Sequence, residues 1–176
     1  MGEGAHADAS VRLEMLSDNN RAVISVVEVS EDQRTFINDG EPISGFIANA
    51  PLHPTFAVYG IYADDQLVGL ISYGHEDHDP VRWWILLSAI DRRFQKRGYC
   101  RGALLIVIER MRQDGPECRE VGLSYLPDNT AAECMYRSLG FEKSPQLNKK
   151  GSVESWLQLR TGATRGQAVQ PRWGRW

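Results

Sequence analysis

Polar and apolar positions in the first half of the chain predict β-strands separated by short turns. Residues 11–16 largely alternate between apolar and polar side chains, which is typical of a strand with one buried face. Residues 56–62 and 67–73 are also strand-like, and the turn-favouring residues 63–66 between them predict a β-hairpin. Residues 83–90 are almost continuously apolar, which indicates a central strand buried on both faces.

Apolar positions three and four residues apart predict the helices. A first helix would begin at a cap on Ser17 or the following aspartate and run to Val27, and a second short helix would span residues 43–50. The apolar face of residues 104–111 predicts a longer helix that ends near a Gly-Pro pair. Residues 129–139 form a last helix, which Asn129 opens and a glycine ends.

Three more strand-like segments complete the pattern. They are residues 117–125, a segment that begins at Phe141, and residues 152–159. The resulting order is β-α-α-β-β-β-α-β-α-β-β, which predicts an α/β fold (of the α+β kind). A length of 176 residues with 42% hydrophobic residues suits one compact domain, which we place at residues 11–160.

Both ends of the chain lack the periodicity of the domain. Residues 1–10 are small and polar, and we expect a flexible terminus there. Residues 161–176 are rich in glycine, glutamine and arginine, contain no acidic residue and include two tryptophans. Two interpretations of this C-terminal segment stay open: a flexible tail, or an arm that docks on a partner subunit.

Charge and cysteine usage narrow the class of protein. The net charge of −3 disfavours a nucleic-acid binder, because the basic residues are locally clustered in an acidic chain. Three cysteines (Cys100, Cys118 and Cys134) form no C-x-x-C pair, which fits a reducing compartment. No apolar stretch approaches the length of a membrane span, and the first residues lack the core of a signal peptide. We therefore expect a soluble, cytoplasmic protein that does not bind membranes.

The segment DRRFQKRGYCRGA, residues 91–103, is the strongest candidate for a binding site. It lies between the predicted central strand and the start of the following helix, where free backbone N–H groups and the helix dipole favour an anion. Its basic side chains add positive charge at the same place: Arg92, Arg93, Lys96, Arg97 and Arg101. We interpret this basic turn as a cradle for a pyrophosphate; the alternative is a solvated basic turn without a ligand.

Two motifs at this separation resemble those of the GNAT (GCN5-related) acyl-CoA N-acyltransferases. Residues 95–103 are similar to the family's Q/R-x-x-G-x-G/A turn, with Gln95 and Gly98 in place and Cys100 where glycine or alanine is usual. Residues 129–141 are similar to its N-x-x-A-x-x-x-Y-x-x-x-G-F signature. The resemblance covers roughly residues 11–159 and is greatest to bacterial diamine or spermidine/spermine acetyltransferases.

The resemblance implies a mixed, mostly antiparallel central sheet flanked by helices, in which the fourth and fifth strands splay apart. It implies acetyl-CoA as cosubstrate, no metal, and a homodimer. Pantetheine would lie against the free strand edges and the pyrophosphate against the basic turn. The cofactor-binding residues that it suggests are Ser88, Ala89, Ile90, Gln95, Lys96, Arg97, Gly98, Tyr99, Cys100, Arg101 and Asn129.

Tyr136 is the candidate general acid. A phenol with a pKa of about 10 is protonated at neutral pH and is matched to a departing thiolate with a pKa of about 8–9. The resemblance implies that Tyr136 lies near the sulfur; the alternative is a core tyrosine, since it belongs to the apolar face of its own helix. Asn129 has two compatible roles, as helix cap and as cofactor ligand.

The general base is not evident. Polyamine acetyltransferases often carry a glutamate on the fourth strand, and Leu86 occupies that position here. A water chain that ends on Glu76, on Asp77 or on a backbone carbonyl could deprotonate the amine instead. The two carboxylates, with Asp39 and Glu41, would also attract a cationic acceptor. Trp84 is a candidate wall of the acceptor pocket, with a cation–π contact to the amine.

Two further features have competing interpretations. The HEDHD sequence of residues 75–79 could bind a metal, but closely spaced histidines and carboxylates in one loop are more often solvated. Cys100, at a helix N-terminus beside arginines, should have a depressed pKa and be reactive. A covalent route through this thiol is conceivable, whereas the resemblance implies direct transfer.

Together these features favour an acetyl-CoA-dependent N-acetyltransferase that acts on a small cationic amine, with di- or polyamines such as spermidine as first choice. Other acceptors remain alternatives: an antibiotic, an amino acid or a protein N-terminus. A second class of function is a non-catalytic acyl-CoA-binding sensor. The presence of Tyr136 argues against a sensor, while Leu86 and Cys100 leave it open.

Overall fold

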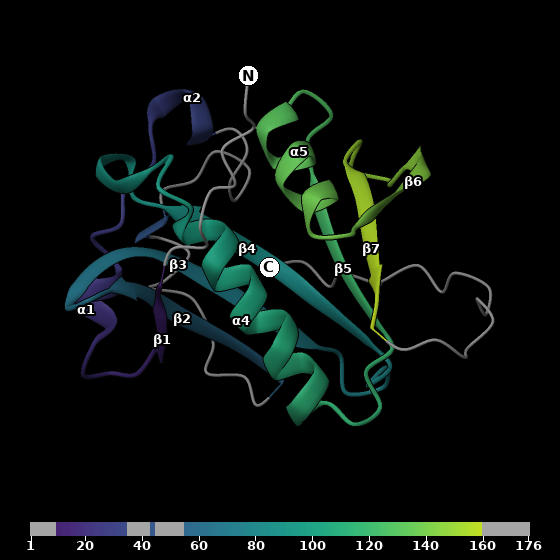
Figure 1. The fold of residues 1–176 in the computed structure, drawn as a ribbon, viewed down its shortest axis with the longest axis horizontal. Helices are drawn as coiled ribbons and strands as arrows, with labels where there is room; N and C mark the ends of the chain where they lie inside the picture. Colours follow the sequence, from purple (N-terminus) through teal and green to yellow (C-terminus); the bar gives the residue numbers. More distant parts are fainter. Residues whose placement is uncertain (1–9, 35–42, 45–54, 160–176) are drawn as a thin grey trace, which may run out of the picture.

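The computed structural model describes residues 10–34, 43–44 and 55–159, and these form one seven-stranded sheet against helices (Figure 1). The strands lie in the order β1-β2-β3-β4-β5-β7-β6. Their bounds are Arg12–Met15 (β1), Phe56–Ala63 (β2), Gln66–His75 (β3), Arg82–Ile90 (β4), Glu120–Tyr125 (β5), Glu142–Leu147 (β6) and Val153–Gln158 (β7).

The sheet is antiparallel except at its centre, where β4 and β5 are parallel. These two strands pair only from Arg82 opposite Glu120 to Ile85 opposite Leu123. Beyond that point they diverge, and the gap between them widens towards the C-terminal end of β4 (Figure 1). The predicted mixed sheet with splayed fourth and fifth strands is confirmed.

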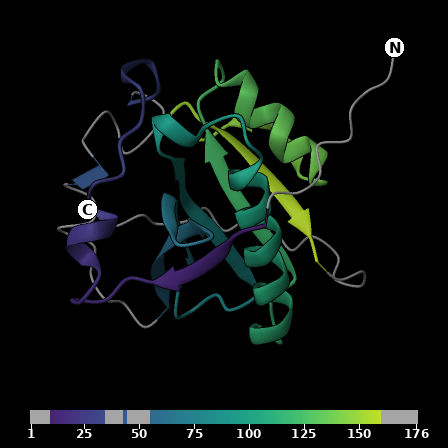
Figure 2. The same ribbon diagram turned by 60° about the vertical axis from the view of Figure 1, so that its left-hand side comes forward.

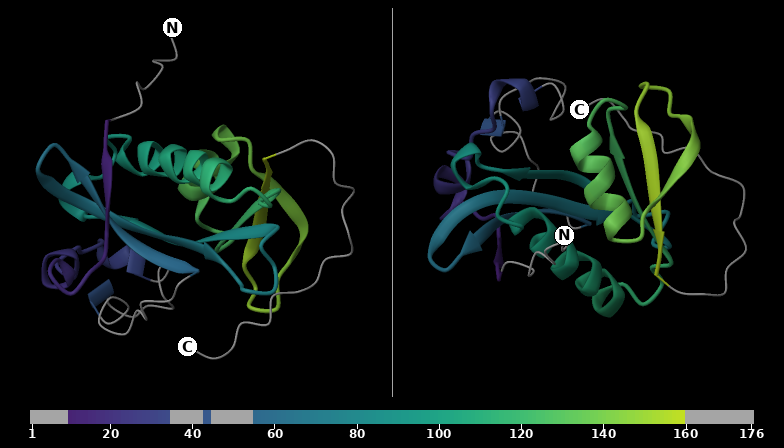
Figure 3. Two further views of the ribbon diagram at one scale, coloured as in Figure 1. Left: turned by 90° about the horizontal axis from the view of Figure 1, so that it is seen from below. Right: turned by 45° about the horizontal axis from the view of Figure 1, so that its top comes forward.

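Helices cover both faces of the sheet. The longer ones, α4 (Tyr99–Asp114) and α5 (Thr130–Ser138), lie on one face, and α1 (Arg21–Ile24) and α2 (Glu31–Arg34) lie on the other (Figures 2 and 3). A short 3-10 turn, η2 (Arg92–Phe94), connects β4 to α4. None of the described helices is both long and apolar enough to cross a membrane.

Strand β4 contributes to two hydrophobic cores, one on each face of the sheet. Ile85 belongs to the core under α4 and α5, together with buried residues such as Leu104 and Val107. Leu87 and Ala89 belong to the smaller core that includes Ile24 of α1. The prediction of a central strand buried on both faces is therefore confirmed. Strand β4 is a rigid support for the basic turn that follows it.

The structure differs from the predicted elements mainly before β2. Helix α1 ends at Ile24 instead of Val27, because the chain tightens into turns in which each N–H bonds the carbonyl three residues earlier. The β-branched residues that follow also disfavour a longer helix. Helix α2 was not predicted. Of the helix expected at residues 43–50, only residues 43–44 are described, and Asp39 and Glu41 lie outside the described residues, as do both ends of the chain.

Candidate active site

The opening between β4 and β5 begins at a β-bulge. On the β3 side of β4, Ser72 lies opposite Leu87 and Tyr73 lies opposite Ile85, so Leu86 is the extra residue. The side chain of Leu86 is 40% exposed although it lies in a central strand. From Leu86 to Ile90, β4 pairs with no described residue of β5. The edge of β4 that faces β5 can therefore hydrogen-bond a ligand.

The basic turn lies at the C-terminal end of β4. Its chain passes through the left-handed region at Lys96 (φ 61°) and Gly98 (φ 81°) before α4 begins at Tyr99. A lysine in this region costs free energy, so the turn is held in a specific conformation by its surroundings. Among the described residues, none accepts a hydrogen bond from the backbone N–H groups of residues 95–100. Unpaired donors at the positive end of a 16-residue helix suit an anion such as a pyrophosphate.

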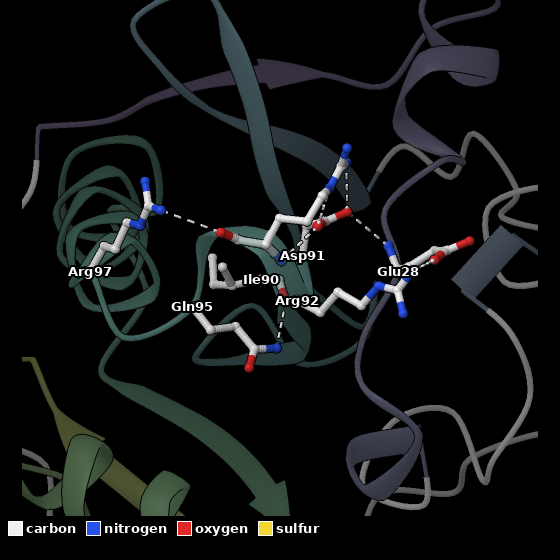
Figure 4. Close-up of polar contacts among 7 residues, drawn as sticks. Glu28, Ile90, Asp91, Arg92, Gln95 and Arg97 are labelled. Atoms are coloured by element: carbon white, nitrogen blue, oxygen red, sulfur yellow. Dashed lines mark hydrogen bonds and ion pairs between the residues drawn. The ribbon is translucent and has the colours of Figure 1, made fainter.

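The side chain of Gln95 is directed towards the protein. Its Nε2 donates to the carbonyl oxygen of Ile90 at 3.0 Å and to Oε1 of Gln33 in α2 at 2.6 Å (Figure 4 shows the bond to Ile90). The guanidinium of Arg97 donates to the carbonyl of Arg93 at 3.5 Å and is otherwise exposed. Gln95 can thus offer its backbone N–H to a ligand, while its side chain supports the turn.

Tyr136 reaches the same region from α5. Its hydroxyl lies 3.3 Å from the hydroxyl of Ser88 on β4, and the two share a hydrogen bond. The rings of Tyr125 and Phe141 enclose it, and only 8% of Tyr136 is exposed. Burial raises the pKa of Tyr136 well above its usual value, and the bond to Ser88 opposes this rise only in part. The phenol therefore keeps its proton at neutral pH and remains available as a proton donor.

Cys100 does not have the depressed pKa that its position predicted. Burial raises the pKa of the Cys100 thiol to about 11, and a hydrogen bond from Ser88 lowers it only in part. The side chain lies in the first turn of α4 and packs against the core beneath that helix. Loss of solvation outweighs the helix dipole and the nearby arginines, so the expectation of a depressed pKa was wrong. Cys118 is buried and Cys134 is exposed.

Asn129 caps the N-terminus of α5, which confirms one of its two predicted roles. Its Oδ1 accepts a hydrogen bond from the backbone N–H of Ala132 at 3.2 Å. A contact with a cofactor stays a prediction. The cap fixes where α5 begins, and α5 in turn delivers Tyr136 to Ser88.

The structure does not bring the acidic loop to this site. Glu76 and Asp77 precede β4, whereas Ser88 and the basic turn lie at its other end. The six residue steps from Arg82 to Ser88 span about 20 Å at the rise of an extended strand. Glu76 contacts His78 at 3.1 Å. Among the described residues, no group of three histidines, cysteines or carboxylates comes together as a metal site.

Trp84 is nearly buried, with 7% exposed, in a contact with another tryptophan. Its ring meets Trp156 of β7 edge to face, with centroids 4.7 Å apart. Gly122 lies beneath both rings, and a Cβ there would approach the ring atoms of each to within 2.8–2.9 Å. A place for Trp84 in an acceptor pocket stays a prediction.

Two side chains of this site were missed from the sequence. The hydroxyl of Ser88 had a signal, since it is a polar group within an apolar strand, but only its backbone was predicted to act. Nothing in the sequence pointed to Gln33, because its contact with Gln95 joins residues that lie 62 positions apart.

Comparison with known proteins places this geometry among acetyltransferases. The sequence model of the acetyltransferase (GNAT) family matches residues 25–141. A curated spermine/spermidine N(1)-acetyltransferase of Bacillus subtilis (strain 168) is 27% identical over 147 residues, which cover 81% of this chain and 94% of that protein.

Solved structures show the same fold at low sequence identity. An acetyltransferase from Thermus thermophilus matches with a TM-score of 0.67 and 15% identity, over 86% of this chain and 99% of that one. Spermidine N-acetyltransferase from Vibrio cholerae, solved with CoA and spermine, matches with a TM-score of 0.69 and 11% identity, over 84% of this chain and 95% of that one.

Proposed function

We propose, from the premise that this chain belongs to the acetyltransferase (GNAT) family, that it transfers the acetyl group of acetyl-CoA to a small cationic amine such as spermidine. One observation carries the proposal. The unpaired edge of β4, the turn with unpaired N–H groups and the protonated phenol of Tyr136 all lie at the C-terminal half of β4. A thioester, a pyrophosphate and a departing thiolate need these three features at one place.

The residues present fit acetyl-CoA. On the stretch of β4 that pairs with no described residue of β5, the backbone groups of Ser88 and Ile90 face away from β3 and would pair with the amides of pantetheine. The backbone groups of Ala89 face β3. The N–H groups of residues 96–100, with the guanidinium of Arg97 close by, would bind the pyrophosphate. Arg101, in the same first turn of α4, would add positive charge.

Transfer would occur by direct attack. The neutral amine nitrogen forms a bond to the thioester carbonyl carbon, the carbon–sulfur bond breaks, and Tyr136 gives its proton to the departing thiolate. The amine loses one proton before the attack, when it becomes neutral, and another once the carbon–nitrogen bond has formed; this second proton would restore the phenol of Tyr136, directly or through water. Backbone N–H groups on the unpaired edge of β4 would stabilise the oxyanion between these steps. The high pKa of Cys100 disfavours a route through a thiolate of the protein.

Neither Leu86 nor the described acidic loop supplies a carboxylate at the opening that could act as general base. The strand position expected to carry one is Leu86, and Glu76 and Asp77 belong to the loop at the far end of β4. We propose that water bound to unpaired carbonyl groups of β4 takes the amine proton. The same carbonyls would attract a cationic nitrogen.

The choice of a polyamine as the acceptor rests on the similarity to the curated relatives. Curated spermine/spermidine acetyltransferases match over 81% of this chain, at about 27% identity. That identity is modest, and loops around the acceptor differ most readily between relatives. A homodimer, which the family resemblance implies, and a cytoplasmic location, which the cysteine usage favours, are further proposals.

The test is release of free CoA from acetyl-CoA, with and without spermidine. Spermidine-dependent release would support both the reaction and the acceptor class. Release that depends on another amine would keep the reaction and reject spermidine. Binding of acetyl-CoA without release, over a panel of amines, amino acids and peptides, would favour a sensor, which is the alternative that Leu86 leaves open.

A further inference from the structure

The segment of residues 28–33 is joined to the basic turn by two sets of hydrogen bonds. At the first, the carboxylate of Asp91 accepts from the backbone N–H of Glu28 at 3.1 Å, and the backbone N–H of Arg92 donates to the carbonyl of Glu28 at 2.7 Å (Figure 4). At the second, Gln95 donates to Gln33 at 2.6 Å. The two connections lie on either side of η2, so they hold the first half of the turn at both its ends.

The first connection is rigid because Asp91 is buried and both oxygens of its carboxylate accept hydrogen bonds. Only 1% of Asp91 is exposed, and its two oxygens also accept three hydrogen bonds from Arg93, at 2.8–3.1 Å. Its backbone N–H donates to the carbonyl of Val68 on β3. This end of the turn is therefore part of the protein core and does not depend on Gln33.

The second connection is a single contact, and it lies where the turn becomes available to a ligand. Gln95 directly precedes Lys96, the residue in the left-handed conformation, and the unpaired N–H groups begin at Gln95 itself. The bond to Ile90 holds the side chain of Gln95 at the end of β4, and the bond to Gln33 restricts the rotation of its side-chain amide. The direction in which the unpaired N–H groups point thus depends on α2.

We propose that Gln33 is a positioning residue for the anion-binding turn and acts through Gln95. This inference rests on the proposed function only for the identity of the ligand, which is the pyrophosphate of acetyl-CoA. Gln33 itself contacts no reacting group. Its side-chain oxygen keeps the donors of the turn in the binding arrangement before the ligand arrives, which lowers the ordering cost of binding.

The test compares Gln33→Ala with Gln33→Glu. Alanine removes the acceptor for Gln95, whereas glutamate retains an oxygen at the same reach. We expect Gln33→Ala to weaken CoA binding, measured by titration calorimetry, roughly three- to tenfold, which corresponds to about 0.7–1.4 kcal/mol. We expect Gln33→Glu to restore binding to within twofold of wild type. With saturating acetyl-CoA and amine, kcat should change by less than about twofold, because only binding of the cosubstrate is affected.

Gln113→Ala is the matched control. Gln113 lies near the C-terminal end of α4 and makes a comparable side-chain contact, to Glu109 at 2.8 Å, far from the turn. It should leave CoA binding unchanged. Equal loss in Gln33→Ala and Gln113→Ala, or no loss in Gln33→Ala, would overturn the proposal. So would a Gln33→Ala variant whose kcat falls as much as its affinity.

Hydrogen exchange of the free protein separates this inference from the proposed function. The N–H of Phe94 donates to the carbonyl of Asp91 within the turn, whereas the N–H of Arg92 belongs to the first connection, which does not depend on Gln33. With no ligand present, Gln33→Ala should accelerate exchange of the Phe94 N–H severalfold relative to wild type and Gln113→Ala, and should leave that of Arg92 unchanged. Unchanged exchange at Phe94 would refute the role of Gln33. A wild-type chain that binds no CoA would refute the proposed function, and the exchange would still decide the role of Gln33.

Discussion

The hydroxyl of Tyr136 lies 3.3 Å from the hydroxyl of Ser88, so a phenol from α5 and an alcohol from β4 meet at the opening between β4 and β5. Neither element alone specifies the contact. Asn129 fixes where α5 begins, and the bulge at Leu86 determines which face of the sheet each later side chain of β4 occupies. The pair links the proposed proton donor to the strand that would hold the thioester in the proposed reaction.

Replacing Tyr136 by phenylalanine removes the proton donor and preserves the ring packing against Tyr125 and Phe141. We expect kcat for amine acetylation to fall about 10²-fold, the lower range for a general acid, with acetyl-CoA binding within threefold of wild type. Tyr125→Phe is the control, since Tyr125 bonds Ser155 at 3.4 Å and has no proposed chemical role. Full activity in Tyr136→Phe would assign the proton to another group.

The pH profile should show no alkaline loss due to Tyr136. A general acid works while protonated, and the raised pKa of Tyr136 keeps it protonated through the range in which a free phenol begins to ionise. We therefore expect kcat to rise with pH as the amine loses its proton, with no decline up to about pH 9.5. A decline that begins near pH 8 and is absent in Tyr136→Phe would contradict this pKa.

Cys100 should react slowly with alkylating agents. With a pKa of about 11, only about 0.1% of the thiol is ionised at pH 8, against about a quarter for an ordinary cysteine. The exposed Cys134 should be modified first by iodoacetamide, as peptide mass spectrometry would show. A Cys134→Ser variant that loses activity within minutes of treatment, with label on Cys100, would show that the thiol is activated.

Asp91 should contribute to stability in a pH-dependent manner. Burial alone would raise its pKa, but the bonds from Arg93 and from the backbone N–H of Glu28 outweigh burial and lower it. Because the folded pKa is below the unfolded one, the stabilisation is complete above about pH 4 and is lost as pH falls through the folded pKa. Asp91→Asn should cost about 1–3 kcal/mol at pH 7 and much less at pH 3, in urea unfolding.

Glu28→Gln is the control for this stability measurement. It alters only the ion pair between the side chains of Glu28 and Arg92, which are 63% and 62% exposed. Such exposed pairs are worth at most about 1 kcal/mol. If both variants unfold at the same urea concentration as wild type, the carboxylate of Asp91 does not secure the turn.

The local pattern of the chain predicted most of the sheet. The alternation and apolar runs placed β2, β3 and β4 within two residues of their ends, and the glycine with its basic neighbours located the turn. These features depend on neighbours in sequence. Helix α1 was overextended and α2 was missed because each has only four residues, too few to show a helical pattern. Helix α2 is also held by a contact with a distant residue, Gln95.

The properties of individual side chains were harder to predict. The position of Cys100 at a helix N-terminus was recognised, but its burial was not, and burial decides its pKa. The acidic loop was placed near the acceptor by its charge, whereas the length of β4 separates it from the turn. The direction of the Gln95 side chain required knowledge of α2. Each depends on which residues meet across the fold.

The extra residue at Leu86 determines which surface each later side chain of β4 occupies. Ser88 reaches Tyr136 on one side of the sheet, while Leu87 and Ala89 enter the core with Ile24 on the other. Deleting Leu86 would remove one step of the pleat and invert the rest of the strand. Two apolar side chains would then face Tyr136 in the candidate active site, and the serine hydroxyl would be forced into hydrocarbon. A single insertion in one strand thus keeps the candidate site and the structural core apart.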